Sequence, residues 1–370
     1  MKLFNINEKT EKNSAETVIQ DVCKIKKGEK VLIIANPETN LIAQQLYDES
    51  EKAGAKTTLI FQKTKTSLDL CEEAVIGAIK SEPDVIFSIS NVKLGKDEKG
   101  IQENYKTEDG KTFDNIFDYL LEGKKSIRGV WTPGITEDIF ERTVCIDYKL
   151  LQERCKKIMA KFDKSVSVHV TSPNGTDVTI STKGRKPMAD DGNFTNAGSG
   201  GNIPCGEVFI SPVVGETTGK IVFDGSMTFS DGDAMLNSPI TCVMNKGFVK
   251  DITGGEEALR LIKDITVAET EPKGLELIGK LPKGQGAVYS RNARNIGELG
   301  IGLNPNANIT GNMLEDEKAF RTCHFAIGEN YDSDAPALIH FDGVVRNPTI
   351  VIKYEDDSEF TLMNIGDLTI

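Results

Sequence analysis

The chain has 370 residues, of which 38% are hydrophobic and 27% charged, a composition typical of a folded protein with about two domains. Acidic residues outnumber basic ones by 56 to 44, and the resulting net charge of −12 repels phosphate backbones, which argues against general nucleic-acid binding. No apolar run reaches the length of a signal peptide or a membrane span, so we expect a cytoplasmic protein without a membrane partner.

The first part of the chain alternates strand and helix signals. Strands are predicted at Lys30–Ala35, Lys56–Phe61, Asp84–Ser90 and Ile127–Trp131. Helices are predicted from Thr39 or Asn40 to Gly54, after a cap at Ser67, at Phe113–Leu121, and from Thr136 to about Ala160. Strands joined by such helices predict a doubly wound, mostly parallel sheet, and hence an α/β scaffold domain over residues 1–160. The first strand is followed by a turn without glycine, which argues against dinucleotide binding.

The pattern changes after residue 160. A hairpin is predicted from Ser165–Thr171 to Thr176–Thr182, and further strands at Glu207–Val213, at Gly219–Met227 and on both sides of Asn245-Lys246-Gly247. Helices are predicted at Gly255–Ile265 and Leu314–Gly328, and a loop at Asp190–Cys205. Residues 161–370 therefore read as an α+β domain around a mainly antiparallel sheet.

Seven cysteines form no Cys-x-x-Cys pair, and their number is odd. In a chain of this size we expect reduced and mostly buried thiols, without a disulfide framework.

The three histidines are His169, His324 and His340. His169 lies in a predicted strand and reads as a structural residue. His340 and Asp342 are two positions apart, so in a strand both side chains leave the same face. This spacing suits two ligands of one metal ion, although an exposed strand face is the alternative.

Glu317 and His324 are seven positions apart in a predicted helix. They would share a face about 10 Å apart along the axis, too far for one compact ion site. This spacing favours two ions about 3.5–4 Å apart, each with one of these residues as a ligand. The alternative is a surface salt bridge from Glu317 to Arg321, four positions later.

Two further carboxylates stand out. Glu298 lies among glycines in Ile296–Leu303, where glycine indicates a bulge or a close backbone approach. Glu207 follows the turn Pro204-Cys205-Gly206 at the start of an apolar strand. Carboxylates together with two imidazoles suit zinc, cobalt, manganese or iron(II).

Four segments resemble the thermophilic metallo-aminopeptidase family, the group of aminopeptidase T and aminopeptidase S, and the chain is closer to its short branch. They are NIPCGEVFISPVVGETTGKIVFDG, IGELGIGLNPNA, LEDEKAFRTCHFAIGENY and ALIHFDG. The opening KIKKGEKVLIIANPETNLIAQQLYDESEKAGAKTTLIF is similar to the N-terminal domain of that family.

The resemblance implies metal ligands at Glu207, Glu298, His324, His340 and Asp342. It makes Glu317 a further ligand or the general base, and Tyr331 a site tyrosine. It also implies two divalent ions (zinc, cobalt or manganese), a metal-bearing C-terminal domain and a homodimer.

We therefore expect a metal-dependent aminopeptidase that removes N-terminal residues from peptides with a metal-activated water. Glu317 would take the proton of this water, and Tyr331 would donate a hydrogen bond to the oxyanion. One alternative is a mononuclear iron(II) ring-cleaving dioxygenase of the dihydroxypyridine type, which has a similar architecture. The other is a metal-binding protein without turnover.

Overall fold

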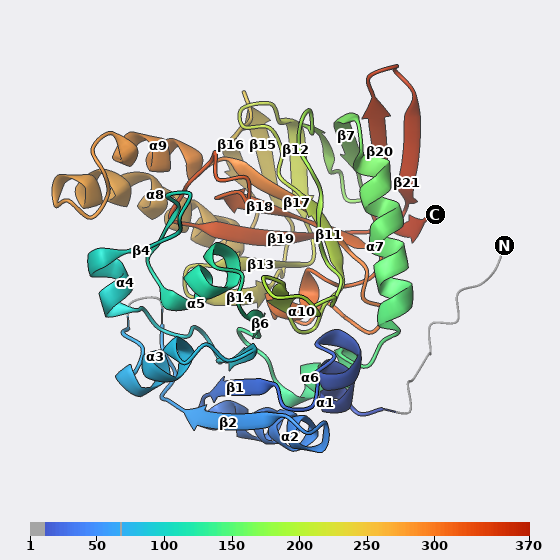
Figure 1. Cartoon of the computed structure of the whole chain (residues 1–370). Coiled ribbons are helices and arrows are strands. Elements are labelled where there is room, and N and C mark those ends of the chain that lie inside the picture. The colour runs from blue at the N-terminus through green and yellow to red at the C-terminus, as the bar shows by residue number, and fades with distance from the viewer. Residues whose placement is uncertain (1–11, 67–68) are drawn as a thin grey trace. The chain divides into compact units, whose positions relative to one another are not determined.

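The computed structural model of the chain describes residues 12–66 and 69–370 (Figure 1). Contacts divide the chain into two compact units. The first comprises Met1–Gln152 and Asp190–Cys205, and the second comprises Glu153–Ala189 and Gly206–Ile370. Among the described residues, no helix has the length and apolar character needed to cross a bilayer.

The first unit contains a five-stranded sheet in which every neighbouring pair is parallel. Its order is β10-β6-β3-β1-β2, with β10 at Gly200–Asn202, β6 at Arg128–Trp131, β3 at Val85–Ile89, β1 at Lys30–Ala35 and β2 at Lys56–Phe61. The predicted parallel α/β sheet is thereby confirmed. The segment 190–205, predicted as a loop, contains one strand of this sheet, β10.

Helices and helical turns precede, connect and follow these strands. They are α1 (Ser14–Thr17), α2 (Asn40–Lys52), α3 (Glu73–Lys80), α4 (Glu98–Glu103), α5 (Ile116–Asp118), α6 (Glu137–Thr143) and α7 (Tyr148–Phe162), with a 3-10 turn at Pro37–Thr39 and π-helical turns at Val18–Val22 and Tyr119–Gly123. A small hairpin, β4 (Tyr105–Lys106) and β5 (Thr112–Phe113), adds two strands. The predicted cap Ser67 lies outside the described residues.

Two helix predictions in this part need correction. The helix predicted at Phe113–Leu121 begins only at Ile116, because Phe113 closes β5. The long helix predicted from Thr136 is two helices. Thr136 caps the first, and the carboxylate of Asp147 accepts hydrogen bonds from the N–H groups of Lys149 and Leu150, which starts the second.

The second unit contains an eight-stranded antiparallel sheet in the order β16-β15-β12-β8-β7-β20-β21-β22. The strands are β7 (Ser165–Thr171), β8 (Asp177–Ser181), β12 (Thr218–Phe223), β15 (Ile240–Asn245), β16 (Phe248–Thr253), β20 (Thr349–Tyr354), β21 (Glu359–Asn364) and β22 (Asp367–Leu368). The predicted hairpin of β7 and β8 and the pair around Asn245-Lys246-Gly247 are confirmed.

A seven-stranded sheet carries the candidate site, in the order β14-β13-β19-β18-β17-β11-β9. Its strands are β9 (Met188–Asp190), β11 (Glu207–Ile210), β13 (Ser226–Phe229), β14 (Gly232–Met235), β17 (Ile296–Gly302), β18 (Thr322–Gly328) and β19 (His340–Arg346). The helices of this unit besides α7 are α8 (Glu256–Leu277), α9 (Gln285–Asn292) and α10 (Met313–Asp316). The strand predicted at Gly219–Met227 is divided between β12 and β13, which lie in different sheets.

The helix predicted at Leu314–Gly328 is wrong. Only α10 is helical, and the chain then turns through Arg321, whose φ is +70°, into strand β18. All seven residues of β18 are buried, and it pairs on both sides, with β17 and with β19 (Figure 1). Pairing within the sheet therefore overrides the helical spacing of its apolar residues.

Candidate metal centre

Strands β17 and β18 place acidic and imidazole groups on one face of the sheet. Glu298 and Gly300 are two positions apart on β17, and so are His324 and Ala326 on β18. In the register of the two strands, Gly300 is opposite His324, and Glu298 is opposite Ala326. A large side chain on one strand therefore faces a small one on the other. A Cβ atom built on Gly300 would lie 2.0 Å from Nε2 of His324, so only glycine leaves space for this ring.

Strand β19 continues the same pattern. Asp342 is opposite Ala326, and His340 is opposite Gly328. His340 and Asp342 lie on one face of the strand, as their spacing predicts, whereas Phe341 between them is on the other face. The small residues of β18 thus leave room for ligating groups of β17 and β19 to approach one another.

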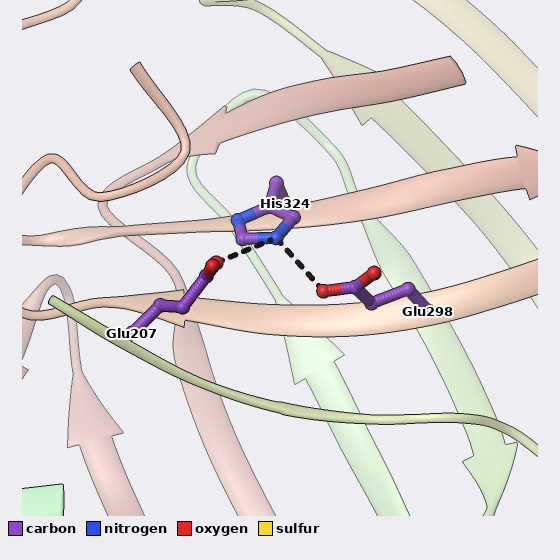
Figure 2. A group of neighbouring side chains, drawn as sticks. All are labelled: Glu207, Glu298 and His324. Atoms are coloured by element: carbon purple, nitrogen blue, oxygen red, sulfur yellow. Dashed lines mark hydrogen bonds and ion pairs between the residues drawn. The ribbon is translucent and has the colours of Figure 1, made fainter. Parts of the chain in front are cut away.

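His324 lies between two carboxylates in the interior (Figure 2). Its Nε2 atom is 3.2 Å from Oε1 of Glu298 and 3.4 Å from Oε2 of Glu207. Glu207 comes from β11, the neighbour of β17, so three adjacent strands supply this group.

His340 faces two carboxylates as well. Its Nε2 atom is 3.3 Å from Oε2 of Glu298 and 3.4 Å from Oδ1 of Asp342. Its other nitrogen, Nδ1, is 2.9 Å from the carbonyl oxygen of Glu329. A carbonyl oxygen can only accept, so Nδ1 carries the proton and donates. In the neutral ring, Nε2 then points its lone pair at two carboxylates, which is the arrangement of a metal-binding histidine.

The Glu317 carboxylate completes the group. One of its oxygens lies within 4.8 Å of ligand atoms of His324 and Asp342. The prediction that Glu317 and His324 are 10 Å apart on a helix is therefore wrong, because the turn before β18 folds them together. The alternative salt bridge is also wrong. Glu317 pairs with its neighbour Lys318, whereas Arg321 pairs with Asp367.

The pKa values show strong electrostatic coupling. Burial alone would raise the pKa of Glu298, but hydrogen bonds from His324 and His340 hold it down to about 2. Burial alone would lower the pKa of His324, but Glu298 and Glu207 raise it to about 9. Burial, and then the charges of Glu207 and Asp342, raise the pKa of Glu317 to about 8, against the opposing effect of Lys318.

The donor set fits a divalent ion. Ligands about 2.1 Å from one ion, at angles between octahedral and tetrahedral, lie about 3.0–3.4 Å apart, and the four distances from the histidine nitrogens to carboxylate oxygens are 3.2–3.4 Å. Oδ1 of Asp342 is buried and accepts no hydrogen bond from the described part of the chain. Three overlapping groups of possible ligands result: Glu207, Glu298 and His324; Glu298, His340 and Asp342; and Glu317, His324 and Asp342.

Tyr331 lies at the edge of this cluster. Its ring centroid is 5.3 Å from that of His340 and 5.1 Å from that of Phe209, and 56% of its surface is exposed. The loop that carries it is anchored by Arg185, whose guanidinium is 2.7 Å from Asp334 and donates to the carbonyl of Pro212.

Of the predicted residues, His169 lies elsewhere, exposed on β7, where its Nε2 atom is 2.8 Å from Asp177. The other predicted site residues are brought together, although their roles as ligands stay predictions. Sequence reasoning missed Lys318 and Arg185. Lys318 directly follows Glu317, but in the predicted helix it would have been a surface residue, so no signal singled it out.

Residues 136–356, more than half of the chain, match the family model of NicX, 2,5-dihydroxypyridine 5,6-dioxygenase. Two solved structures share the fold. The 2,5-dihydroxypyridine dioxygenase of Pseudomonas putida KT2440 superposes with a TM-score of 0.68 and 16% identity, over 96% of both chains. Wild-type AmpT of Thermus thermophilus superposes with a TM-score of 0.65 and 16% identity, over 96% of this chain and 98% of its own. The search of curated proteins finds no match.

Proposed function

The chain belongs to the family of 2,5-dihydroxypyridine 5,6-dioxygenase, and from this membership we propose that it is an iron(II)-dependent enzyme that opens a dihydroxylated aromatic ring with dioxygen. The observation that carries the proposal is that the imidazoles of His324 and His340 each approach the carboxylates of Glu298 and Asp342 on one face of the sheet. Two histidines and a carboxylate with open positions are the ligand set of non-haem iron(II) oxygenases. Glu298, between the two histidines, is the fourth candidate ligand.

The reaction needs no external reductant. The bond between two adjacent ring carbons breaks, each carbon takes one oxygen atom, and the substrate supplies all the electrons that reduce dioxygen. When bound, iron(II) would supply the redox activity that lets dioxygen react with an aromatic ring.

We assign the proton and binding roles to residues of this chain. Glu317 is the candidate group for exchanging a proton with a substrate hydroxyl, because its pKa of about 8 is close to neutral pH. It accepts a proton in its ionised form, which predominates above that pH. Tyr331 and Phe209, whose rings are in contact beside His340, offer an aromatic surface on which a flat substrate ring can pack. The Tyr331 hydroxyl can donate a hydrogen bond to a substrate oxygen.

A metal-dependent aminopeptidase is the second candidate. The observation that favours it is the surplus of carboxylates, since Glu207 and Glu317 are left over even when Glu298 and Asp342 hold one ion with the two histidines. In that case two zinc, cobalt or manganese ions would supply an activated water, and Glu317 would accept its proton. A protein that binds metal without turnover is the third outcome that the experiment below distinguishes.

The test is anaerobic reconstitution of the chain with iron(II), or with zinc, cobalt or manganese. Oxygen uptake is then recorded with 2,5-dihydroxypyridine and related aromatic diols, and amino-acid release with a peptide library. We expect oxygen uptake and loss of ring absorbance with iron(II) only. Release of N-terminal residues without oxygen uptake would establish the aminopeptidase instead. If neither activity is detected, the result would support a protein that binds metal without turnover.

His340→Ala and His169→Ala form a matched pair for this test. Both variants remove one imidazole. His169, however, is exposed on β7, where it pairs with Asp177 and lies outside the candidate centre. We expect His340→Ala to abolish oxygen uptake and His169→Ala to retain it. Loss of uptake in both variants, or in neither, would contradict the assignment of the centre.

A further inference from the structure

Lys318 is a fully buried lysine within the candidate centre, with 0% of its surface exposed. Its Nζ atom is 3.1 Å from Oε1 of Glu207 and also pairs with the carboxylate of Glu317. A lysine is almost never fully buried unless its charge is paired. Its backbone is fixed too, because the carbonyl oxygen of Lys318 accepts a hydrogen bond of 2.9 Å from the N–H of Asn304.

The two carboxylates that contact Lys318 are the two left over from the proposed ligands. Glu298 and Asp342 each approach both histidines, whereas Glu207 and Glu317 approach only one of them, His324. Glu207 and Glu317 are therefore the carboxylates that would have to hold a second ion. Both carboxylates are already in contact with an ammonium group. A second dication between them would lie within a few ångströms of this positive charge, in an interior where charges are weakly screened.

We propose that the ammonium group of Lys318 takes the place of a second metal ion, so that the centre holds one ion per chain. Lys318 supplies one positive charge to the two carboxylates of Glu207 and Glu317 and keeps them oriented beside the ion. The inference rests on the metal-binding part of the proposed function and not on its substrate. The number of bound ions therefore tests the inference, and oxygen uptake tests the proposed reaction separately.

The test is a titration of the metal-free wild-type chain with Mn²⁺ alone, followed by elemental analysis and electron paramagnetic resonance. We expect one bound Mn²⁺ per chain with the spectrum of an isolated ion. Two ions per chain with an exchange-coupled spectrum would overturn the inference. No bound ion at saturating Mn²⁺ would overturn both the inference and the metal centre.

The variant Lys318→Gln sharpens the test because it removes the charge and keeps a hydrogen-bonding group. We expect a second, weaker Mn²⁺ site in this variant, since Glu207 and Glu317 lose their counterion. The control Lys353→Gln removes a partly exposed lysine that pairs with Asp357, and it should keep one ion. A single ion in Lys318→Gln would overturn the inference. If that variant does not fold, the count in the wild-type chain decides.

Discussion

The ring of His340 has its two nitrogens in different surroundings. Nδ1 donates to the carbonyl of Glu329, and Nε2 faces Glu298 and Asp342. The backbone carbonyl therefore keeps a proton on Nδ1 and turns Nε2 toward the two carboxylates, which is the orientation of a metal-binding histidine. The spacing of His340 and Asp342 is sufficient to predict that they share a strand face, because every second side chain of a strand lies on the same face.

His340→Ala removes one ligand and leaves its buried partners in place. Loss of a residue that only supports a metal ligand lowers metal affinity by up to about 100-fold. Because His340 is a proposed ligand itself, we expect its loss to lower Mn²⁺ affinity by at least that factor. The fold should persist, because the side chain of His340 is only partly buried, with 24% exposed. Calorimetric titration with Mn²⁺ measures the affinity, and circular dichroism checks the fold. Unchanged affinity would show that His340 is not a ligand.

The neighbours of Lys318 could not be predicted from the sequence. Its ion pairs with Glu207, 111 positions earlier, and with the adjacent Glu317 depend on a turn that the helical pattern of Leu314–Gly328 concealed. The prediction of two ions depends partly on the spacing of Glu317 and His324 in this wrong helix and partly on a count of ligands, and it stays a prediction. The buried cation among these ligands is a feature that only the folded chain reveals.

At the scale of elements, the pairing of β17 with β18 decides the shape of the centre. The glycine-rich pattern around Glu298 predicts a strand with a bulge or a close backbone approach, and the structure shows the reason for these glycines. The register shifts between Ile296 and Glu298, which is the irregularity that the glycines indicated. Gly300 lies under the ring of His324, so the position of the ring depends on a residue of the adjacent strand.

Gly300→Ala tests this dependence. The added Cβ atom would lie 2.0 Å from Nε2 of His324, so the ring must move away from Glu298 and Glu207. We expect Mn²⁺ affinity to fall by at least about 100-fold, with a stability loss of about 1–3 kcal/mol from overpacking. Gly77→Ala in α3 is the control, because nothing lies within 4 Å of its added Cβ atom. Wild-type affinity in Gly300→Ala would mean that His324 does not bind the ion.

The loop that carries Tyr331 is the second element that affects function. Arg185 anchors it through Asp334, with only 11% of the arginine side chain exposed. We expect Arg185→Met to raise KM for the aromatic substrate about tenfold, which corresponds to a loss of about 1.4 kcal/mol in binding. The Mn²⁺ content should stay unchanged.

Arg260→Met is the matched control for this loop, since Arg260 pairs with Asp231 in the turn between β13 and β14 and packs on Phe229. Steady-state kinetics of both variants checks the prediction. Equal KM values in Arg185→Met and the wild type would show that the anchoring of this loop does not contribute to substrate binding.

At the scale of the whole molecule, composition and periodicity predicted the fold class. The parallel sheet follows from strands such as KVLIIA that alternate with helices, and the antiparallel sheets follow from the hairpin around Pro173-Asn174-Gly175. The order of strands could not be predicted, because β13, β17, β18 and β19 become neighbours across long connections. The seven cysteines carry thiols, and six of them are buried, in agreement with the prediction of mostly buried thiols.

These buried thiols predict how stability depends on pH. Burial raises the pKa of Cys23 and of Cys242 to about 12, from an ordinary value near 9. Between pH 9 and 12 the unfolded chain releases these protons and the folded chain keeps them, so the free energy of unfolding falls as the pH rises. Each thiol contributes a slope of about 1.4 kcal/mol per pH unit. Urea unfolding between pH 9 and 11 should show a shallower slope in Cys242→Ala, and an unchanged slope would contradict the argument.

The central claim is that one metal centre in this fold opens an aromatic ring with dioxygen. The most direct measurement is mass spectrometry of the product that the iron(II)-loaded chain forms from 2,5-dihydroxypyridine under ¹⁸O₂. We expect a ring-opened product that carries both labelled oxygen atoms. A product without label, or an intact ring after prolonged incubation while the same chain releases N-terminal residues from peptides, would contradict it.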